Sequence, residues 1–204
     1  VRLKRYKMHK SELHNDPLIQ FEHWYAQTLE SGEADPDAMT LATVDAQGRP
    51  SARTVLYKGI DDGGFLVFTN YNSRKSKELL LNPYAALVFY WPKLYRQVRI
   101  EGKAKKITVA ESQRYFETRP YESKISAWVS EQSHVIPSRE FLLERHIETQ
   151  KKFADDAVIC PDFWGGFRLI PNKIEFWLGN EHRLHDRFCY VKKGAQWEIL
   201  RLAP

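Results

Sequence analysis

Residues 39–69 read MTLATVDAQGRPSARTVLYKGIDDGGFLVFT, and this stretch decides the fold class. Three short runs at 40–44, 52–58 and 65–69 are rich in β-branched and apolar residues. The turn sequences DAQG at 45–48 and DDGG at 61–64 separate these runs. Short apolar runs bounded by Asp and Gly are typical of strands joined by tight turns. The stretch therefore predicts an antiparallel meander of three strands.

Further strands and helices are expected on both sides of this stretch. Asp16 as N-cap and Pro17 at the first helical position predict a helix that ends near 31–32. Other helices are expected at 72–81, 109–118, 123–130 and 138–153, and other strands at 85–91, 97–105, 166–170, 174–177, 183–191 and 197–202. Short strands with tight turns and peripheral helices predict a mainly β protein with a closed or nearly closed barrel. We expect one domain over 16–204, preceded by a flexible basic tail over 1–15.

Composition limits the classes of ligand and compartment. The 204 residues carry a formal net charge of +5, which suits phosphorylated small molecules or nucleic acid without selecting between them. Cys160 and Cys189 lie far apart outside any Cys-x-x-Cys pattern, which argues against a disulfide scaffold or a thiolate zinc site. There is no apolar run of membrane-spanning length and no apolar segment of the signal-peptide kind at the start. We therefore expect a soluble, cytoplasmic protein.

The segment 182–187, with sequence HRLHDR, is the strongest indication of a binding site. On a strand, Arg183, His185 and Arg187 would share one face, with Trp177 just upstream as a flat apolar wall. Such a face suits a flat, anionic ligand. A solvated, Arg-rich outer face explains the same pattern equally well.

A second group of cations is expected around a helix start. Ser73, Arg74 and Lys75 bring a hydroxyl, two cations and free backbone N–H groups together, as a phosphate group requires. An ordinary N-cap followed by surface cations is the simpler alternative. Arg53 and Lys58 lie on the preceding hairpin, where strict alternation places them on opposite faces unless a bulge intervenes.

Two further sets of polar residues that could bind a ligand follow later in the chain. Tyr115, Arg119 and Ser123 recur every four residues and would lie along one side of a helix, although a proline at 120 interrupts it. A helix-terminal arginine facing water is the alternative to an anion site. Gln132 and Ser133 lie in a polar loop and could bind the edge of a heterocycle.

Several other functions lack their motifs. His182 and His185 would face opposite ways on a strand, and neither cysteine completes a zinc set, so no metal site is expected. The chain has no Gly-x-Ser-x-Gly elbow, no Walker loop and no Gly-x-Gly-x-x-Gly. Hydrolase, NTPase and Rossmann functions are therefore not indicated.

From about residue 16 to residue 204 the chain resembles the pyridoxine (pyridoxamine) 5′-phosphate oxidases, FMN enzymes of the split-barrel flavoprotein group. The resemblance rests on an ordered set of motifs: SRK (73–75), RQV (96–98), YF (115–116), RP (119–120), AWVS (127–130), QS (132–133), FWGGF (163–167), IEFW (174–177), HRLHDR (182–187) and RLAP (201–204). It implies an antiparallel, Greek-key split β-barrel and a homodimer with FMN between its subunits. The implied reaction is oxidation of pyridoxine 5′-phosphate or pyridoxamine 5′-phosphate to pyridoxal 5′-phosphate, with hydride transfer from C4′ to flavin N5 and O₂ reduced to H₂O₂.

The resemblance also implies roles for individual residues. The implied FMN contacts are Arg53, Thr54, Val55, Leu56, Lys58, Phe68, Thr69, Ser73, Arg74, Lys75, Gln97, Gln132, Ser133, Trp177 and Arg187. The implied substrate contacts are Lys58, Tyr115, Arg119, Ser123, Arg183 and His185. We hypothesise that the last two are catalytic and position the substrate, with His185 a candidate proton acceptor for the alcohol. Arg5 and Tyr6 resemble a segment that closes over the substrate, but their spacing to Asp16 is a few residues short. Leu178, Asn180 and Phe68 also depart from the family pattern, where Gln, Gly and Tyr are common.

Two alternatives remain at this point. Another split-barrel protein, such as a flavin or deazaflavin reductase, would share the fold, but it would not need Tyr115, Arg119, Arg183 and His185. A nucleic-acid-binding β-barrel would account for the basic charge and for aromatic residues making up 13% of the chain. It lacks a clustered basic and aromatic motif.

Overall fold

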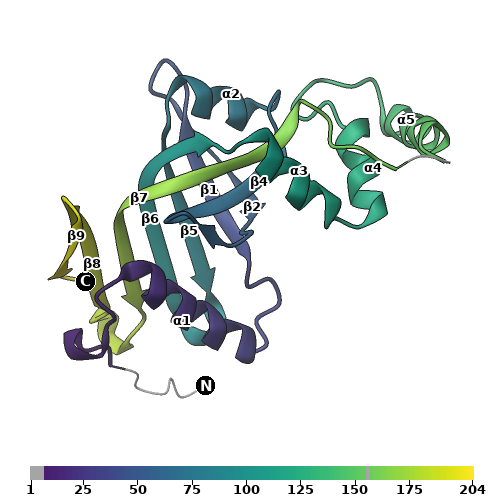
Figure 1. The fold of residues 1–204 in the computed structure, drawn as a ribbon. Coiled ribbons are helices and arrows are strands. Elements are labelled where there is room, and N and C mark those ends of the chain that lie inside the picture. The colour runs from purple at the N-terminus through teal and green to yellow at the C-terminus, as the bar shows by residue number, and fades with distance from the viewer. Residues whose placement is uncertain (1–6, 155–156) are drawn as a thin grey trace.

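A computed structural model of the chain describes residues 7–154 and 157–204. Its helices are α1 (Pro17–Glu30), α2 (Arg74–Leu81), α3 (Val109–Glu117), α4 (Tyr121–Val129) and α5 (Arg139–Lys152), with short 3-10 helices η1 (Lys10–Glu12), η2 (Pro92–Leu94) and η3 (Glu181–Arg183). Its strands are β1 (Ala38–Val44), β2 (Pro50–Leu56), β3 (Ile60–Asp61), β4 (Gly64–Asn70), β5 (Tyr84–Trp91), β6 (Arg96–Lys106), β7 (Trp164–Leu178), β8 (Asp186–Lys193) and β9 (Gln196–Arg201). The expected mainly β architecture with peripheral helices is confirmed (Figure 1).

The strands form one antiparallel sheet that curls into a barrel. Its order is β2-β1-β5-β6-β7-β4-β3, and β8 and β9 extend it from β7. Backbone bonds from Lys58 N to Leu66 O (3.0 Å) and from Leu66 N to Gly59 O (2.9 Å) connect the end of β2 to β4. β2 is the first strand in this order and β4 lies near its other end, so these bonds close the sheet into a barrel.

The predicted three-strand meander is confirmed, although its second hairpin is short: Ile60 pairs with Phe65 and Asp61 pairs with Gly64, around the expected turn. β1 and β2 pair along their full lengths, and β4 also pairs with β7 about a hundred residues away in sequence. The chain is redirected after β2 by Gly59, whose φ of 102° strongly favours glycine.

The sequence signals for helix ends are confirmed. Asp16 accepts a hydrogen bond from the Leu18 N–H at 2.8 Å, and Pro17 opens α1. Thr108 and Glu111 form the reciprocal capping box expected at the start of α3. The interruption at Pro120 separates α3 from α4.

An aromatic core fills the barrel under α1. Figure 1 shows α1 lying across one end of the barrel, with α3, α4 and α5 beyond the opposite end. Phe21 on α1 is fully buried, with its ring centre 4.9 Å from those of Phe65 and Phe89. Trp24 meets Phe176 edge to face at 5.1 Å. The apolar face of α1 therefore closes this end of the barrel.

The two strands expected at 166–170 and 174–177 are one continuous strand, β7. Pro171 predicts an interruption, since it lacks a backbone donor. The structure instead places a β-bulge beside it: Glu101 pairs with Lys173 and Gly102 with Pro171, so Asn172 of β7 is the extra residue. A Cβ at Gly102 would lie 2.1 Å from the Ile170 carbonyl oxygen, so only glycine permits this approach.

The strand expected from residue 183 is wrong at its start. β8 begins at Asp186, and residues 181–183 form η3. His182 and Arg183 both have left-handed backbones, with φ of 59° and 61°. Arg183, His185 and Arg187 therefore do not alternate along one strand, as the sequence pattern predicted.

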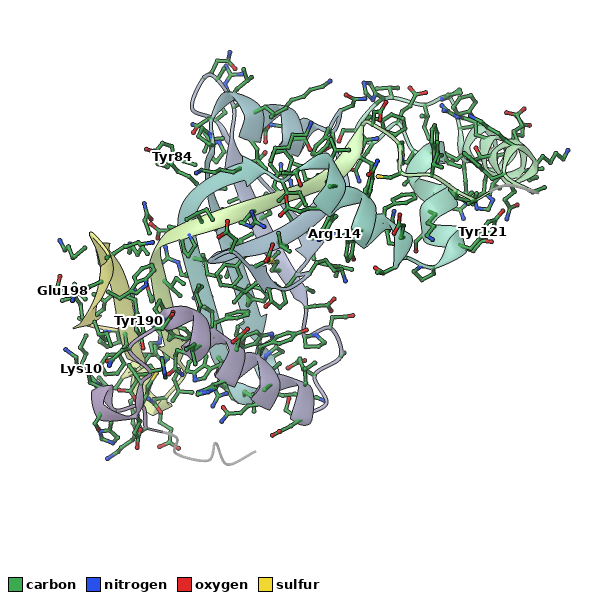
Figure 2. All side chains as sticks on the ribbon, viewed as in Figure 1. Lys10, Tyr84, Arg114, Tyr121, Tyr190 and Glu198 are labelled. Carbon is green, nitrogen blue, oxygen red and sulfur yellow. The ribbon has the colours of Figure 1, made fainter. Side chains whose placement is uncertain are left out.

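The segment before residue 16 packs on the barrel. Met8 is buried in the main core, and its N–H donates to Asp186 at 3.2 Å. The hydroxyl of Tyr190 on β8 donates to the His14 carbonyl, and Figure 2 shows Tyr190 near the segment that carries Lys10. The packed structure thus begins before the expected boundary at residue 16, while Arg5 and Tyr6 lie outside the described residues. None of the helices in the described ranges is long and apolar enough to cross a membrane.

Candidate functional site

A cavity of about 600 Å³ lies where the barrel meets α2, α3 and α4. It is lined by Thr54, Val55, Leu56, Lys58, Phe68, Thr69, Asn70, Lys75, Tyr115, Thr118, Arg119, Pro120, Ser123, Ser126, Ala127, Ser130, Gln132 and Trp164. Within the described part of the chain, this lining contains three cationic side chains and no carboxylate. The volume is typical of small-molecule sites, and the charge favours an anionic ligand.

Three stacked aromatic rings form part of the cavity wall. Phe68 from β4 and Tyr115 from α3 lie parallel within 16°, with ring centres 3.8 Å apart. Trp164 at the start of β7 continues the stack at 5.5 Å from Phe68. The rings give the wall a rigid apolar surface with a phenol group at its edge.

Lys75 provides a buried positive charge beside this wall. Only 9% of the residue is exposed, and its Nζ donates to Gln132 Oε1 (2.7 Å), Thr69 Oγ1 (2.9 Å) and Ser73 Oγ (3.2 Å). Burial, and secondarily the charge of Arg53, lowers the pKa of Lys75 to about 8. Within the described residues the partners of the ammonium group are all neutral, so a bound anion would offset the cost of its burial.

Arg119 provides a second buried cation. It follows α3, and its guanidinium carbon lies 4.5 Å from the centre of the Trp164 ring. Burial lowers the pKa of Arg119, and its Nη1 has no hydrogen-bond partner in the part of the chain that the structure describes. A buried donor without a partner is costly, so this atom is well placed to bind an acceptor supplied by a ligand.

The start of α2 lies next to the cavity. The backbone N–H of Arg74 donates to Ser133 Oγ at 3.2 Å, and Ser73 is fully buried as the N-cap. The side chains of Arg53 and Arg74 do not line the cavity but converge on Glu78, at 3.4 and 2.8 Å. Of the three residues expected to bind a phosphate group, Lys75 lines the cavity, and Ser73 and Arg74 precede it at the start of α2.

A second group of predicted site residues lies in a row across β6, β7 and β8. Gln97 is paired with Trp177, which in turn is paired with Arg187. Residues paired in this way project from the same face of a sheet. Arg187 donates to Glu175 at 2.8 Å and to the Ala203 carbonyl at 2.8 Å, and the hydrogen bond to Glu175 raises the pKa of Arg187.

The loop before β8 carries Arg183 and His185. His185 Nδ1 accepts the N–H of Asn180 at 3.1 Å, and its ring centre lies 4.6 Å from that of Trp177. A neutral imidazole that accepts at Nδ1 carries its hydrogen on Nε2. Arg183 is exposed on a left-handed backbone, a conformation that costs of the order of 1–3 kcal/mol in a residue with a side chain. Such a cost at a cationic position is typical of binding loops.

Within one chain the predicted residues therefore form two groups. The cavity is lined by Thr54, Val55, Leu56, Lys58, Phe68, Thr69, Lys75, Gln132, Tyr115, Arg119 and Ser123. Ser73 contacts Lys75, Arg53 contacts Glu78, and Arg74 and Ser133 line a neighbouring hollow of about 430 Å³. Gln97, Trp177, Arg183, His185 and Arg187 belong to the other group and do not line the cavity. Figure 2 shows Tyr121, at the start of α4, and Glu198, on β9, at opposite ends of the molecule.

The sequence reasoning missed seven lining residues: Asn70, Thr118, Pro120, Ser126, Ala127, Ser130 and Trp164. Ser126, Ala127 and Ser130 follow Ser123 at spacings of three, four and seven, so helical periodicity could have identified this small, polar face of α4. Asn70, whose side chain donates to the Ser130 carbonyl, gave no sequence signal of its own.

The residues present fit the phosphorylated flavin that the family resemblance implies. The cavity offers a flat aromatic wall, a buried ammonium group with neutral partners and a buried guanidinium atom without one. The α2 N-terminus adds backbone donors beside it. A planar ring system with a phosphate group meets each of these features.

Comparisons with known proteins cover nearly the whole chain. A family model described as pyridoxamine 5′-phosphate oxidase matches residues 26–150, and one described as pyridoxine 5′-phosphate oxidase C-terminal dimerisation region matches residues 164–204. Among curated proteins, the pyridoxine/pyridoxamine 5′-phosphate oxidase of Coxiella burnetii is 60% identical over 97% of this chain and 100% of its own. The enzyme of the same name from Rippkaea orientalis is 51% identical over 98% of this chain and 95% of its own.

Solved structures show the same fold. The structure of PhzG from Burkholderia lata, in complex with tetrahydrophenazine-1-carboxylic acid, has a TM-score of 0.90 at 29% identity and covers 95% of each chain. A pyridoxamine 5′-phosphate oxidase-related, FMN binding protein from Nostoc punctiforme has a TM-score of 0.74 at 17% identity, covering 90% of this chain and 97% of its own.

Proposed function

The chain belongs to the pyridoxamine 5′-phosphate oxidase family, and we propose that it oxidises pyridoxine 5′-phosphate and pyridoxamine 5′-phosphate to pyridoxal 5′-phosphate with FMN as cofactor. The observation that carries this function is the cavity: its lining has buried cations from α2 and from the end of α3, an aromatic wall and no carboxylate among the described residues. Two phosphorylated ligands require two anion-binding groups, and Lys75 and Arg119 supply them from different elements.

The phosphate of FMN is assigned to the start of α2. Ser73, Arg74 and Lys75 would hold it, with Arg53 and Ser133 at the same end of the cavity. Thr69 and Gln132 fix the Lys75 ammonium group, which keeps this charge in place before the ligand arrives. The chemistry that bound FMN supplies is acceptance of a hydride and its delivery to dioxygen as hydrogen peroxide.

The phosphate of the substrate is assigned to Arg119. Nη1 of this residue is buried without a partner, and stacking on Trp164 holds the guanidinium group in place. Tyr115 and Ser123 line the same cavity and supply hydroxyl donors, and Lys58, held by Asp37 at 3.3 Å, lies on the same lining. Binding at this end would orient the reactive carbon of the substrate toward the flavin ring.

The second group of residues completes the site from a second subunit. The dimerisation-region match at 164–204 contains Trp177, Arg183, His185 and Arg187, and it supports a homodimer. Because these residues do not line the cavity of their own chain, we propose that they line the cavity of the partner. FMN would then lie at the subunit interface, in contact with both groups.

Arg183 and His185 would position the substrate rather than remove its proton. The Nδ1 atom of His185 already accepts the Asn180 N–H, so the neutral ring presents an N–H at Nε2. That group donates a hydrogen bond to the oxygen or nitrogen on C4′, and it does not serve as the proton acceptor expected from the sequence. Arg183, which makes no hydrogen bond or ion pair within the described ranges, adds a positive charge beside it.

Two further expectations remain proposals. We assign residues 16–204 to one FMN-binding domain, with the packed part of 7–15 attached to it through Met8. A cytoplasmic location agrees with two cysteines that are both free, at Cys160 and Cys189.

The proposed function is tested by purifying the full chain and analysing its flavin. We expect a yellow protein that releases FMN on denaturation and that forms pyridoxal 5′-phosphate and hydrogen peroxide from either substrate in air. A flavin or deazaflavin reductase would instead oxidise a reduced nicotinamide or reduce a deazaflavin without forming pyridoxal 5′-phosphate. A preparation that neither binds FMN nor oxidises either substrate would contradict the proposal.

A further inference from the structure

Glu78 is a buried carboxylate on α2, one turn after Arg74. It does not line the cavity, and only 4% of the residue is exposed. Its Oε1 accepts the Arg74 Nε–H at 2.8 Å. Its Oε2 accepts the hydroxyl groups of Thr43 and Ser51, at 2.5 and 2.6 Å, and lies 3.4 Å from Nη2 of Arg53. One carboxylate therefore joins β1, β2 and α2.

This carboxylate is ionised under all ordinary conditions. Burial by itself raises the pKa of Glu78, but hydrogen bonds from Ser51, Thr43 and Arg74 outweigh burial and lower the pKa to about 2. A buried charge is tolerated when partners of this kind surround it. Glu78 thus supplies a permanent negative charge between two guanidinium groups.

Glu78 restricts the two guanidinium groups that flank the proposed phosphate position. The side chain of Arg74 is 62% exposed, and within the described residues Glu78 is the one side chain to which it donates. Arg53 also donates to Thr43, Ser51 and the Leu41 carbonyl, so its orientation depends on the same cluster. Long exposed arginines lose much rotamer freedom on binding, and a pre-formed ion pair removes part of that cost.

The charges also balance. Arg53, Arg74 and Lys75 carry three positive charges, and Glu78 reduces the net charge of the group to about +2, which matches the charge of −1.5 to −2 on a phosphate monoester at neutral pH. Crowding among the cations is evident, because the charge of Arg53 adds to burial in lowering the pKa of Lys75.

We propose that Glu78 is a positioning residue for the cofactor phosphate, which holds Arg53 and Arg74 in the orientation that binds it. This inference rests on the proposed function, since it takes FMN to be the ligand. It requires that a negative charge next to a phosphate site should strengthen phosphate binding. If Glu78 acted only through its negative charge, it would repel the phosphate group. Removing that charge would then tighten FMN binding.

The test compares FMN with riboflavin, which lacks the phosphate. The deflavinated full chain and its Glu78→Gln variant are titrated with each flavin by fluorescence quenching. We expect the Kd for FMN to rise about tenfold or more, corresponding to about 1.4 kcal/mol, while the Kd for riboflavin is unchanged. Glu111→Gln is the matched control, because Glu111 also pairs with an arginine, Arg168, but does so away from the cavity.

Two further measurements separate positioning from a merely structural role. Far-ultraviolet circular dichroism and the thermal midpoint report whether Glu78→Gln folds. If it does not, Glu78→Asp retains the charge but shortens the reach toward both arginines, and weaker FMN binding with unchanged riboflavin binding is expected. Equal loss of affinity for both flavins, unchanged FMN affinity or tighter FMN binding would overturn the proposal. A wild-type chain that binds no FMN would instead contradict the proposed function on which it rests.

Discussion

Lys75→Met removes the buried ammonium group beside the cavity while it keeps a long, unbranched side chain. In the folded apoprotein the pKa of Lys75 is lowered from 10.5 to about 8 by burial and by Arg53. The unfolded chain therefore binds more protons than the folded chain between these values. The free energy of unfolding of the wild-type apoprotein should rise with pH across this window, and the variant should lack this rise.

The magnitude follows from the lowered pKa. A fall from 10.5 to about 8 corresponds to about 3 kcal/mol, at about 1.4 kcal/mol for each pH unit. The hydrogen bonds lost from Lys75 to Thr69, Ser73 and Gln132 add an offset that does not depend on pH. The difference between the wild type and the variant should therefore shift by about 3 kcal/mol in favour of the wild type as pH rises through the window.

The assay is urea unfolding of both deflavinated proteins between about pH 7 and about pH 11, where the proton linkage acts. Lys77→Met, which removes an exposed lysine of the same helix, is the matched control. FMN titrations of the wild type should show weaker binding as pH rises above about 8, whereas Lys75→Met should bind weakly throughout. A stability difference that stays constant from neutral pH to above pH 10.5 would refute the reasoning about Lys75.

Three other predictions concern stability at acid pH, substrate binding and the aromatic core. In urea unfolding, the free energy of unfolding of Glu78→Gln should be lower than that of the wild type by up to about 3 kcal/mol above about pH 4.5. This difference should vanish as the pH falls toward about 2, where the Glu78 carboxylate of the wild type becomes protonated. Arg119→Ala should raise the KM for pyridoxine 5′-phosphate at least about tenfold, the minimum for losing a charged hydrogen bond, while the Kd for FMN is unchanged; equal losses for both ligands would contradict its assignment. Phe21→Ala should lower the free energy of unfolding by about 3–5 kcal/mol, and a loss below about 1 kcal/mol would show that α1 does not close the barrel.

Local sequence signals predicted the local structure well. Asp16, Pro17 and Thr108 fixed helix ends because capping depends on residues a few positions apart. The pairing of β4 with β7 could not be predicted in this way, since it joins segments about a hundred residues apart. The single strand through Pro171 was also missed, because its bulge depends on Gly102 in another strand.

The candidate site shows the same contrast between features that depend on neighbouring residues and features that depend on distant ones. Tyr115, Arg119 and Ser123 do line one cavity, but not along one helix as their spacing predicted, because α3 ends at Glu117 and α4 begins at Tyr121. The alternation expected at 182–187 failed because His182 and Arg183 adopt left-handed backbones, for which no Gly or Asn gave a signal. Glu78 was not singled out either, because its role arises from three elements that meet only in the fold.

The central claim is that the cavity of one chain and the Arg183–His185 loop of its partner form one active site. Arg119→Ala and His185→Ala homodimers are prepared separately and assayed at a substrate concentration well below the wild-type KM, where a tenfold rise in KM leaves about a tenth of the wild-type rate. The two proteins are then unfolded together and refolded as a mixture. One site of each mixed dimer would contain neither substitution, so about a quarter of the wild-type activity should return. A mixture that remains no more active than its components, with mixed dimers demonstrated by differential tagging, would contradict the claim.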